Sequence, residues 1–336
     1  MSIFEKNIIV VGVTGRVGRE MLSILNEENI PAQNISGAAS PRSAGNFVNY
    51  GNSQIEVQNL ENVDFSKYHI ALFSAGSEVS KKYAPIAASK GAIVIDNTSF
   101  FRMEKDIPLI VPEINFLDIE KYENKKIIAN PNCSTIQMVM ALKPLHDKFK
   151  LKEVVASTYQ ATSGAGQKGV EELINQIPQV LKNEKIEPNH FKKQIAFNVI
   201  PQIDSFTDTL YTKEEIKMMN ETRKILGDNN IDITATCVRV PVVTGHSVSV
   251  FAKFENDVDL NEAIESLKNF EGIVVYDNPE NYEYSTPIDA AHRNEVFVSR
   301  IRKHPKQKNV LTFWCVSDNL RKGAALNAVQ IAKKLS

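Results

Sequence analysis

The sequence predicts an α/β protein whose first half is a doubly wound parallel sheet. An apolar run, a glycine turn and an amphipathic helical pattern follow one another over residues 7–25. Further apolar runs at 69–76 and 91–99 are separated by a helical pattern at 77–90, and another run follows at 126–130. Strands that alternate with helices form a parallel sheet covered on both faces, and such sheets bind ligands at the carboxyl ends of their strands.

The turn between the first strand and the first helix carries a glycine motif. Gly12, Gly15 and Gly18 form the pattern G-x-x-G-x-x-G, a variant of the Rossmann-type dinucleotide fingerprint. Early glycines allow a tight turn close to a pyrophosphate at the helix N-terminus, and the last one allows the helix to pack on the strand. Some glycine patterns are only tight turns, but the strand–turn–helix context favours a nucleotide site. The contacts expected in this half are Gly12, Thr14, Gly15, Arg16, Val17, Gly18, Ser74, Ala75 and Gly76.

The residues after the second predicted strand indicate which nucleotide is bound. An NAD site usually has Asp or Glu about 20 residues beyond the glycines, to bind the ribose 2′-hydroxyl. No acidic residue occurs between Asn29 and Ile55, and the chain there presents Ser40, Arg42 and Ser43. A cation flanked by hydroxyls suits a 2′-phosphate. The alternative is a solvated arginine in a loop, but the missing acid favours NADP over NAD.

A cysteine stands where the fourth apolar run ends and a long helical pattern begins. Cys133 follows the polar corner 130–132 and precedes the helix expected over 134–149. The N–H groups and dipole of a helix N-terminus stabilise a thiolate and lower the pKa of the thiol. Most lone cysteines are small, buried hydrophobic residues. The polar neighbours of Cys133 argue against that interpretation here. Cys237 and Cys315 lie in apolar, strand-like runs and are predicted to be packing residues.

Further along the chain, polar groups suited to assist a thiolate appear at the ends of predicted strands. One strand ends in a glycine-rich turn that presents Gln160, Ser163 and Gly164, and two later strands carry Arg239 and His246. Histidine titrates near neutral pH and is a plausible proton acceptor, although a lone histidine in a strand is more often structural. An arginine among valines needs an anionic partner. That partner is either a structural aspartate or a substrate carboxylate, and the residues alone leave both open.

Composition excludes several classes of function. The 336 residues include 39 basic and 40 acidic ones, so no general attraction to nucleic acid or to an anionic membrane is expected. The first residues do not resemble a signal peptide, and no segment approaches a membrane span. Three distant cysteines and scattered histidines predict neither disulfides nor a metal site. A reducing, cytoplasmic compartment is expected.

Taken together, the motifs resemble one known family over essentially the whole chain, the aspartate-β-semialdehyde dehydrogenases. The segments that carry this resemblance are GVTGRVG, SPRSAG, LFSAGSEVS, IDNTSFFRM, VPEIN, NPNCSTIQMV, STYQATSGAG, NVIPQID, YTKEEIKMMNETRKIL, TCVRVPVVTGHS and SDNLRKGAALNAVQIA. One departure is visible, because Phe100 stands where the family pattern has alanine. It lies two residues before Arg102 and is expected to affect the shape of that pocket.

The resemblance implies a role for each residue of the site. Cys133 would be the nucleophile that becomes an acyl-thioester, Gln160 would orient the substrate, and His246 would be the acid/base. Arg239 would bind the substrate α-carboxylate, with Glu214 assisting at its polar groups. Phosphate would be held by Arg102 and Lys217. The glycine turn and the residues Ser40, Arg42, Ser43, Ser163, Gly164 and Asn319 would hold NADP.

The resemblance also implies the reaction and the architecture. The enzyme would interconvert L-aspartate 4-semialdehyde plus phosphate with L-4-aspartyl phosphate, on the route to diaminopimelate, lysine, threonine and methionine. Residues 1–130 would form the NADP-binding domain, completed by a C-terminal helix at about 318–336. Residues 131–317 would form an α+β catalytic and dimerisation domain with an antiparallel-rich sheet, and the assembly would be a homodimer or a homotetramer.

Three other functions fit part of this pattern. The related N-acetyl-glutamyl-phosphate reductases share the thiol chemistry and NADP, but the segments around Arg239 and Lys217 match the aspartate enzymes better. An NADP-binding redox sensor would use Cys133 as a regulatory thiol. A thiol hydrolase that uses Cys133 and His246 would leave the glycine turn and Arg42 without a function.

Overall fold

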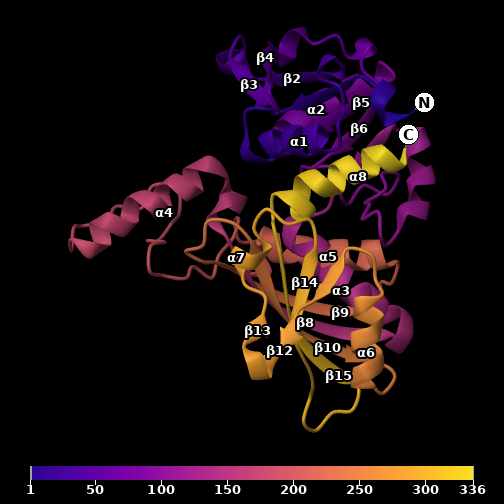
Figure 1. Ribbon diagram of the computed structural model, residues 1–336, viewed down its shortest axis with the longest axis vertical. Helices are drawn as coiled ribbons and strands as arrows, with labels where there is room; N and C mark the ends of the chain where they lie inside the picture. The colour runs from indigo at the N-terminus through magenta and orange to yellow at the C-terminus, as the bar shows by residue number, and fades with distance from the viewer. Residues whose placement is uncertain (1, 336) are drawn as a thin grey trace. The chain divides into compact units, whose positions relative to one another are not determined.

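The computed structural model describes residues 2–335 (for residue 124 the backbone only) and divides the chain into two compact units (Figure 1). The N-terminal unit consists of Met1–Asn132 with Ala324–Ser336, and the central unit consists of Cys133–Gly323. The first contains a mostly parallel sheet between helices, and the second contains a mixed sheet with helices. The predicted fold class, a Rossmann-like domain followed by an α+β domain, is confirmed.

The N-terminal unit is built on a seven-stranded sheet with the order β3-β4-β2-β1-β5-β6-β7. Its strands are β1 (Ile8–Val11), β2 (Ile35–Ala39), β3 (Phe47–Tyr50), β4 (Ser53–Asn59), β5 (Ile70–Phe73), β6 (Ile93–Asp96) and β7 (Ile127–Ala129). All neighbours are parallel except β3 and β4. Val11 pairs with both Ala38 and Phe73, so the turns after β1, β2 and β5 leave the sheet at one level. The strand order reverses at β1, which is where sheets of this type bind ligands.

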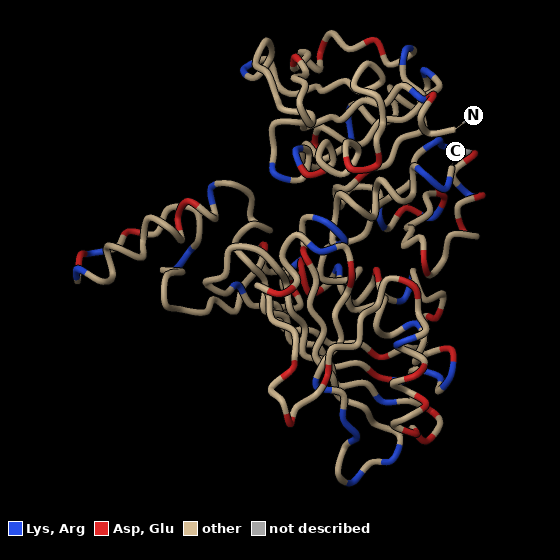
Figure 2. Tube along the Cα trace, viewed as in Figure 1, with Lys and Arg blue, Asp and Glu red and all other residues tan. Residues whose placement is uncertain are grey.

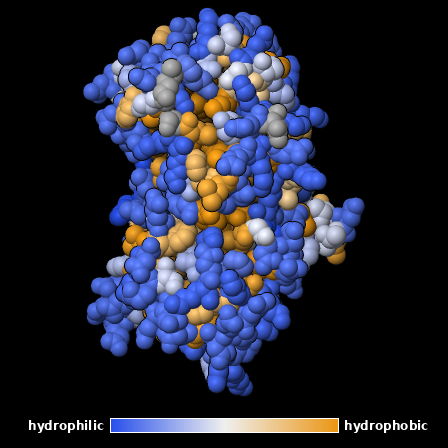
Figure 3. All heavy atoms as spheres, turned by 90° about the vertical axis from the view of Figure 1, so that its right-hand side faces the viewer, coloured by the Kyte–Doolittle hydropathy of each residue, from blue (hydrophilic) through white to orange (hydrophobic). Residues whose placement is uncertain are grey.

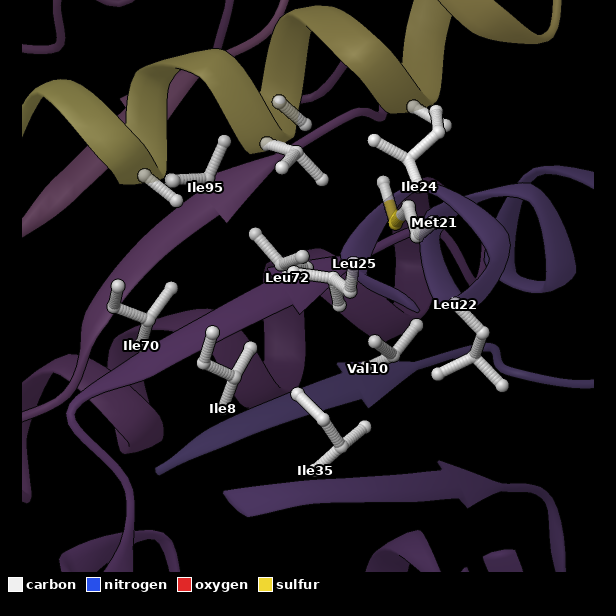
Figure 4. Close-up of a cluster of buried hydrophobic side chains, with 14 of the residues drawn as sticks. Ile8, Val10, Met21, Leu22, Ile24, Leu25, Ile35, Ile70, Leu72 and Ile95 are labelled. Carbon is white, nitrogen blue, oxygen red and sulfur yellow. The ribbon is translucent and has the colours of Figure 1, made fainter. Parts of the chain in front are cut away.

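Helices cover this sheet and complete its core. They are α1 (Arg16–Glu27), α2 (Ser77–Ser89) and α8 (Leu326–Lys334), with short turns η1 (Ile3–Glu5), η2 (Ala32–Asn34), η3 (Pro41–Ser43), η4 (Leu60–Asn62), η5 (Phe65–Lys67) and η6 (Phe116–Asn124). Figure 4 shows Ile8 and Val10 of β1 facing Met21 and Leu25 of α1, with α8 alongside. Strands buried on both faces, such as β1 and β5, read as continuous apolar runs, which is why they were predictable.

The central unit is built on a six-stranded sheet with the order β11-β14-β15-β10-β8-β9. Its strands are β8 (Leu151–Gln160), β9 (Asp232–Arg239), β10 (His246–Phe254), β11 (Ile273–Val275), β14 (Val296–Lys303) and β15 (Val310–Ser317), beside a hairpin of β12 (Asp277–Asn278) and β13 (Glu283–Tyr284). The inner neighbours are antiparallel, whereas β11 and β9 pair in parallel at the two edges. The antiparallel-rich sheet expected here is therefore present, with parallel edges that were not expected.

One face of this sheet is covered by helices and the other is more open. The helices and turns of the unit are α3 (Cys133–Phe149), α4 (Gly166–Leu181), α5 (Lys213–Leu226), α6 (Leu260–Lys268), α7 (Pro287–Ala290), η7 (Thr162–Ala165) and η8 (Pro279–Asn281). The helix α3 is buried along most of its length against the sheet. On the other face Val155 and Tyr159 are exposed, and the ring of Tyr159 lies 5.2 Å from that of Trp314. The helix α4 projects from the rest of the unit (Figure 1).

The C-terminal segment departs from the expected regular helix. Helical spacing predicted one helix over residues 323–335, but Arg321–Ala325 forms a π-helical turn and the α-helix begins only at Leu326. This turn lies where the chain passes from the central unit to the N-terminal unit. Single π-helical turns often accompany functional sites.

Positive and negative charges are mixed along the chain, and neither sign dominates. Lys and Arg are interspersed with Asp and Glu along both units (Figure 2), and hydrophilic side chains predominate on the face shown in Figure 3. Within residues 2–335 no helix is long and apolar enough to cross a membrane.

Candidate active site

A cavity of about 540 Å³ lies at the carboxyl ends of the strands in the N-terminal unit. Predicted cofactor contacts line it, namely Gly12, Thr14, Gly15, Ser40, Ser74 and Ala75. They come from the turns after β1, β2 and β5, which the register places at one level. The volume is in the range of small-molecule and cofactor sites.

The glycine turn is closely packed and leaves no room for side chains at two positions. A Cβ atom on Gly12, which has a φ of +89°, would lie 2.4 Å from the carbonyl oxygen of Ser74. A Cβ atom on Gly18 would lie 2.3 Å from the carbonyl oxygen of Gly12. The N-cap of α1 is Gly15, which has no side chain to cap the helix. The turn therefore has the form of a backbone cradle at a helix N-terminus, and it fits a dinucleotide pyrophosphate.

The same cavity contains residues that the sequence interpretation missed. In η3, next to Ser40, Arg42 is exposed and Ser43 is half-buried, while Glu61 of η4 and Lys82 of α2 line the cavity. Glu61 lies beyond the acid-free window between Asn29 and Ile55. One sequence signal could have indicated the contacts on α2. Val79, Lys82 and Tyr83 have helical spacing, so they share the face of α2 that lines the cavity.

Arg102 is buried in the N-terminal unit and held by backbone carbonyl groups. Its Nε donates to the carbonyl oxygen of Asn130 at 2.9 Å, and its Nη2 donates to that of Asn97 at 2.9 Å. The side-chain amide of Asn130 donates to Oδ1 of Asn97 at 2.7 Å, which ties the ends of β6 and β7 together. Phe100 is 36% exposed and its ring packs edge-on against Phe101 at 4.7 Å. Arg102 is thus anchored by the backbone carbonyl groups of Asn130 and Asn97, and the side chain of Phe100 takes no part in these two hydrogen bonds.

In the central unit Cys133 is the first residue of α3, as expected, and it is partly exposed. A Cβ atom on Gly323 would lie 3.0 Å from the Cβ of Cys133, so a side chain at position 323 would crowd the thiol. Cys237 and Cys315 are fully buried in β9 and β15, as predicted. Burial raises the pKa of the Cys237 thiol, and it raises that of Cys315 to about 12. Neither of these two is suited to act as a thiolate.

Strand register brings the polar candidates together around the backbone of Ala161. Gln160 at the end of β8 pairs with Arg239 at the end of β9, while His246 begins β10. The N–H of Ala161 donates to Nδ1 of His246 at 3.0 Å, and Nη1 of Arg239 donates to the carbonyl oxygen of Ala161 at 2.6 Å. A Cβ atom on Gly164 would lie 3.0 Å from Nε2 of His246 and 3.1 Å from Nη1 of Arg239. Only glycine at position 164 leaves both groups unobstructed.

The protonation of His246 is set by this environment. The ring is fully buried, and desolvation, followed by the nearby charge of Arg239, lowers its pKa well below the usual value. The imidazole is therefore neutral at neutral pH. Because Nδ1 accepts a hydrogen bond, the proton lies on Nε2. That Nε2 has no hydrogen-bond partner among the described residues, so it is the nitrogen that a ligand oxygen would meet.

A chain of hydrogen bonds leads from Gln160 to the surface. Its Nε2 donates to Oε1 of Glu214 at 3.1 Å. Lys217 donates to Oε2 of Glu214 at 3.2 Å and to Oδ2 of Asp204 at 2.9 Å. Burial alone would lower the pKa of Lys217, but the two carboxylates outweigh it and raise the pKa. Lys217 is therefore a cation held between two anions.

Asn319 joins the same part of the central unit. Its Oδ1 accepts a hydrogen bond from the N–H of Gly245 at 2.9 Å, and its Nδ2 lies 3.0 Å from Oγ of Ser163.

The predicted site residues fall into two groups, one in each unit. The N-terminal unit holds the glycine turn, Ser40, Arg42, Ser43, Ser74, Ala75, Gly76 and Arg102, and the central unit holds Cys133, Gln160, Ser163, Gly164, Glu214, Lys217, Arg239, His246 and Asn319. Among residues 2–335 no cluster of His, Cys, Asp and Glu could hold a metal ion.

Comparison with known families matches two parts of the chain to family models. Residues 7–122 match the family model described as semialdehyde dehydrogenase, NAD binding domain. Residues 142–322 match the model described as semialdehyde dehydrogenase, dimerisation domain. The class of protein is therefore a semialdehyde dehydrogenase, an oxidoreductase that acts on an aldehyde.

Individual relatives show which semialdehyde dehydrogenases this chain is most similar to among those compared. The aspartate-semialdehyde dehydrogenase of Aquifex aeolicus is 50% identical over 98% of this chain and 97% of its own. The crystal structure of aspartate semialdehyde dehydrogenase II from Vibrio cholerae, complexed with ASA, has a TM-score of 0.95 at 45% identity and 98% coverage of both chains. The Candida albicans enzyme, solved with NADP, has a TM-score of 0.75 at 25% identity and 98% coverage of both chains. This chain belongs to the aspartate-semialdehyde dehydrogenase family.

Proposed function

We propose that this chain interconverts L-aspartate 4-semialdehyde plus phosphate with L-4-aspartyl phosphate, using NADP and a cysteine thioester. The observation that carries the proposal is the arrangement in the central unit. Cys133 begins a helix, Nε2 of His246 has no hydrogen-bond partner within residues 2–335, and Arg239 is a buried cation. In one unit these residues supply a nucleophile, a proton-bearing group for an oxygen, and a partner for a carboxylate.

In the oxidative direction, the Cys133 thiolate forms a bond to the aldehyde carbon, and the carbonyl electron pair moves to oxygen. The helix N-terminus favours the thiolate. The Nε2–H of His246 donates a hydrogen bond to this oxygen in the tetrahedral thiohemiacetal, which stabilises the oxyanion, and the carbonyl re-forms from that oxyanion as the hydride leaves. Gln160, fixed by Glu214 at 3.1 Å, orients the adduct. NADP supplies the acceptor for the hydride that leaves the same carbon.

The second half of the reaction is acyl transfer to phosphate. We assign phosphate binding to Arg102 and Lys217, both cations that the surrounding protein holds in place. Phosphate oxygen attacks the thioester carbon, and the Cys133 thiolate leaves. A thiol suits both halves, because the thiolate is a strong nucleophile and also a good leaving group.

For cofactor binding we assign the cavity of the N-terminal unit. The backbone cradle formed by Gly12, Gly15 and Gly18 suits the pyrophosphate. Ser40, Arg42 and Ser43 suit a 2′-phosphate, which supports NADP rather than NAD. The remaining contacts we assign are Thr14, Arg16, Val17, Ser74, Ala75 and Gly76 in this unit, and Ser163, Gly164 and Asn319 in the central unit.

We also propose the biological setting. The aspartyl phosphate reaction precedes lysine, threonine and methionine, and the absence of a disulfide among the described cysteines suits a reducing cytoplasm. The match to a dimerisation domain and the open sheet face around Val155, Tyr159 and Trp314 support a homodimer. Light scattering coupled to size exclusion would distinguish a dimer from a tetramer.

The test follows NADPH absorbance with purified protein, NADP and L-aspartate 4-semialdehyde, with phosphate present or omitted. We expect phosphate-dependent NADPH formation that Cys133→Ser abolishes and that Cys315→Ala, which alters a buried thiol, retains. N-acetyl-glutamate 5-semialdehyde, the substrate of the related reductases, should be a poor replacement. Binding of NADP without turnover of either aldehyde would contradict the proposal and favour a redox sensor.

A further inference from the structure

The corner that follows β7 is fixed by hydrogen bonds to Asn130. The strand ends at Ala129, and Asn130 is followed by Pro131, which has no N–H to donate. The backbone N–H of Asn130 donates to the carbonyl oxygen of Asp96 at 2.8 Å. Its carbonyl oxygen accepts from Nε of Arg102 at 2.9 Å. The position of Asn130 therefore sets one of the backbone groups that hold the Arg102 guanidinium.

The side chain of Asn130 is fully buried and uses both of its polar atoms. Its Nδ2 donates to Oδ1 of Asn97 at 2.7 Å and to the carbonyl oxygen of Ala324 at 3.2 Å. Its Oδ1 accepts from Nδ2 of Asn327 at 2.7 Å. The backbone carbonyl of Asn97 also accepts from Nη2 of Arg102 at 2.9 Å. The two carbonyl groups that hold Nε and Nη2 thus belong to residues that the Asn130 amide ties together.

Asn327 determines which way the Asn130 amide points. It is the second residue of α8 and fully buried, and its Nδ2 also donates to the carbonyl oxygen of Ile110 at 2.9 Å. Both hydrogens of this amino group therefore have acceptors. A rotated Asn130 amide would turn its amino group toward Nδ2 of Asn327, and its oxygen toward the acceptor oxygens of Asn97 and Ala324. Such contacts between like groups are unfavourable in a protein interior, so one orientation is selected.

The network connects segments that lie far apart in the sequence. Asn327 comes from α8, Ala324 from the π-helical turn Arg321–Ala325, and Asn130 and Asn97 follow β7 and β6. All four residues belong to the N-terminal unit. An apolar residue at position 327 would suit the buried face of α8, but it would leave Oδ1 of Asn130 without its donor from this helix. The buried amide therefore indicates a role that core packing alone does not require.

We propose that Asn327 is a positioning residue for phosphate. It acts through Asn130 and Asn97, whose carbonyl groups fix two N–H groups of Arg102 and with them the plane of the guanidinium. The direction of this plane matters, because arginine binds phosphate through a planar set of donors. The assignment rests on the proposed function, in which Arg102 binds phosphate. It gives the last helix of the chain a part in the phosphate step.

The experiment compares the kinetic constants for phosphate with those for the other ligands in the full-length enzyme. We expect Asn327→Ala to lower kcat/KM for phosphate about 5- to 30-fold. The KM for L-aspartate 4-semialdehyde and the dissociation constant of NADPH, measured by fluorescence, should change less than about 3-fold. The matched control is Asn115→Ala. Its amide bonds the backbone of Leu109 and Val111, on either side of Ile110, so its loss loosens the same segment without removing a bond of Asn130. All three constants should stay within about 2-fold in this control.

A double-mutant cycle shows whether Asn327 acts through Arg102. In an Arg102→Lys background, which lacks the planar guanidinium, Asn327→Ala should change kcat/KM for phosphate less than about 2-fold. Asn97→Ala removes the other end of the network, keeps the backbone carbonyl, and should show the same selective loss for phosphate even if Asn327→Ala folds poorly.

Two results would overturn the proposal. One is a folded Asn327→Ala enzyme with an unchanged constant for phosphate. The other is an equal loss for phosphate, aldehyde and NADPH that persists in the Arg102→Lys background, since Asn327 would then serve stability alone. A wild-type enzyme whose turnover does not depend on phosphate would instead contradict the proposed function, so the two failures are distinguishable.

Discussion

His246 shows that the environment of a residue, rather than its type, decides its protonation. Its ring is fully buried, and the neighbouring charge of Arg239 adds to the desolvation that lowers its pKa. An exposed histidine would be partly cationic near pH 6.5. In the folded enzyme His246 is neutral well below that pH, with its proton on Nε2, and a hydrogen-bond donor is therefore present throughout the neutral range.

The lowered pKa of His246 predicts a loss of stability in acid. In the unfolded chain the histidine binds a proton as the pH falls through about 6.5, whereas the folded state excludes it until a lower pH. Stability contributed by this group is therefore present above pH 6.5 and falls below it. Between pH 7.5 and 5.5 we expect the wild type to lose about 1 kcal/mol more unfolding free energy than His246→Gln. Urea unfolding at the two pH values measures this difference, and parallel losses in both proteins would contradict it.

Asp96 is a second residue whose importance comes from burial. It is fully buried at the end of β6 and accepts from Oγ of Ser80 at 2.7 Å, from the N–H of Thr98 at 3.0 Å and from Oγ1 of Thr98 at 2.7 Å. Removing the carboxylate leaves buried donors without a partner. We expect Asp96→Ala to lower the free energy of unfolding by about 2–4 kcal/mol.

The matched control for Asp96 is Asp64. Its carboxylate also accepts from a following N–H and hydroxyl, those of Ser66, but it is at the surface. Water replaces those bonds, so Asp64→Ala should cost much less in urea unfolding. Similar losses in the two variants would show that hydrogen-bond number, and not burial, determines the cost.

At the residue scale, sequence reasoning works where a residue type is unusual for its setting. A cysteine at a polar corner before a helix and an arginine among valines could be singled out, and their proposed roles remain predictions. Asp96, Lys82 and Asp204 gave no such signal, because an acid or a lysine in a polar segment looks like any solvated one. The surroundings of these side chains depend on how distant segments of the chain meet.

At the scale of elements, the glycine turn links the sequence pattern to steric constraint. Gly18 lies inside α1, where alanine would normally favour the helix by up to about 1 kcal/mol. The Cβ atom would, however, lie 2.3 Å from the carbonyl oxygen of Gly12 and 2.8 Å from Cα of Val13. Because both neighbours are backbone atoms, the helix itself must move away from the strand.

We therefore expect Gly18→Ala to lower the free energy of unfolding by about 1–3 kcal/mol, despite its better helix propensity. It should also weaken NADPH binding measured by fluorescence titration. Gly15→Ala is the control for folding, since its Cβ would lie 3.3 Å from the same oxygen and its φ suits any residue. A stabilised Gly18→Ala protein with normal NADPH affinity would refute the steric explanation.

Elements differ in how well the sequence revealed them. The buried strands β1, β5, β6 and β7 are continuous apolar runs, and α2 has clear helical spacing, so their positions were predictable. The edge strand β3 is short and alternates exposed with buried residues, which gives a weak signal. The π-helical turn at Arg321–Ala325 has the same spacing as the start of a helix and could not be distinguished from one.

At the scale of the whole molecule, the N-terminal unit is completed by a segment from the far end of the chain. The helix α8 places Ala328, Val329 and Ile331 in the same core as β1 and α1. Sequence periodicity shows that such a helix is amphipathic, but not which surface it covers. The fold class could thus be predicted, while this long-range packing depends on the three-dimensional path of the chain.

This arrangement predicts that the stability of the nucleotide-binding sheet depends on the last helix. Ile331 is fully buried, and truncating it leaves a cavity in the core shared with α1. We expect Ile331→Ala to lower the free energy of unfolding by about 2–4 kcal/mol. Ile86→Ala, on α2 of the same unit and 42% exposed, removes the same atoms from a surface position and should cost much less. Unfolding curves from urea titration, with NADPH affinity measured in parallel, test both. If Ile331→Ala were as mild as Ile86→Ala, α8 would be an accessory to the core, and the sheet would be stable without the returning chain.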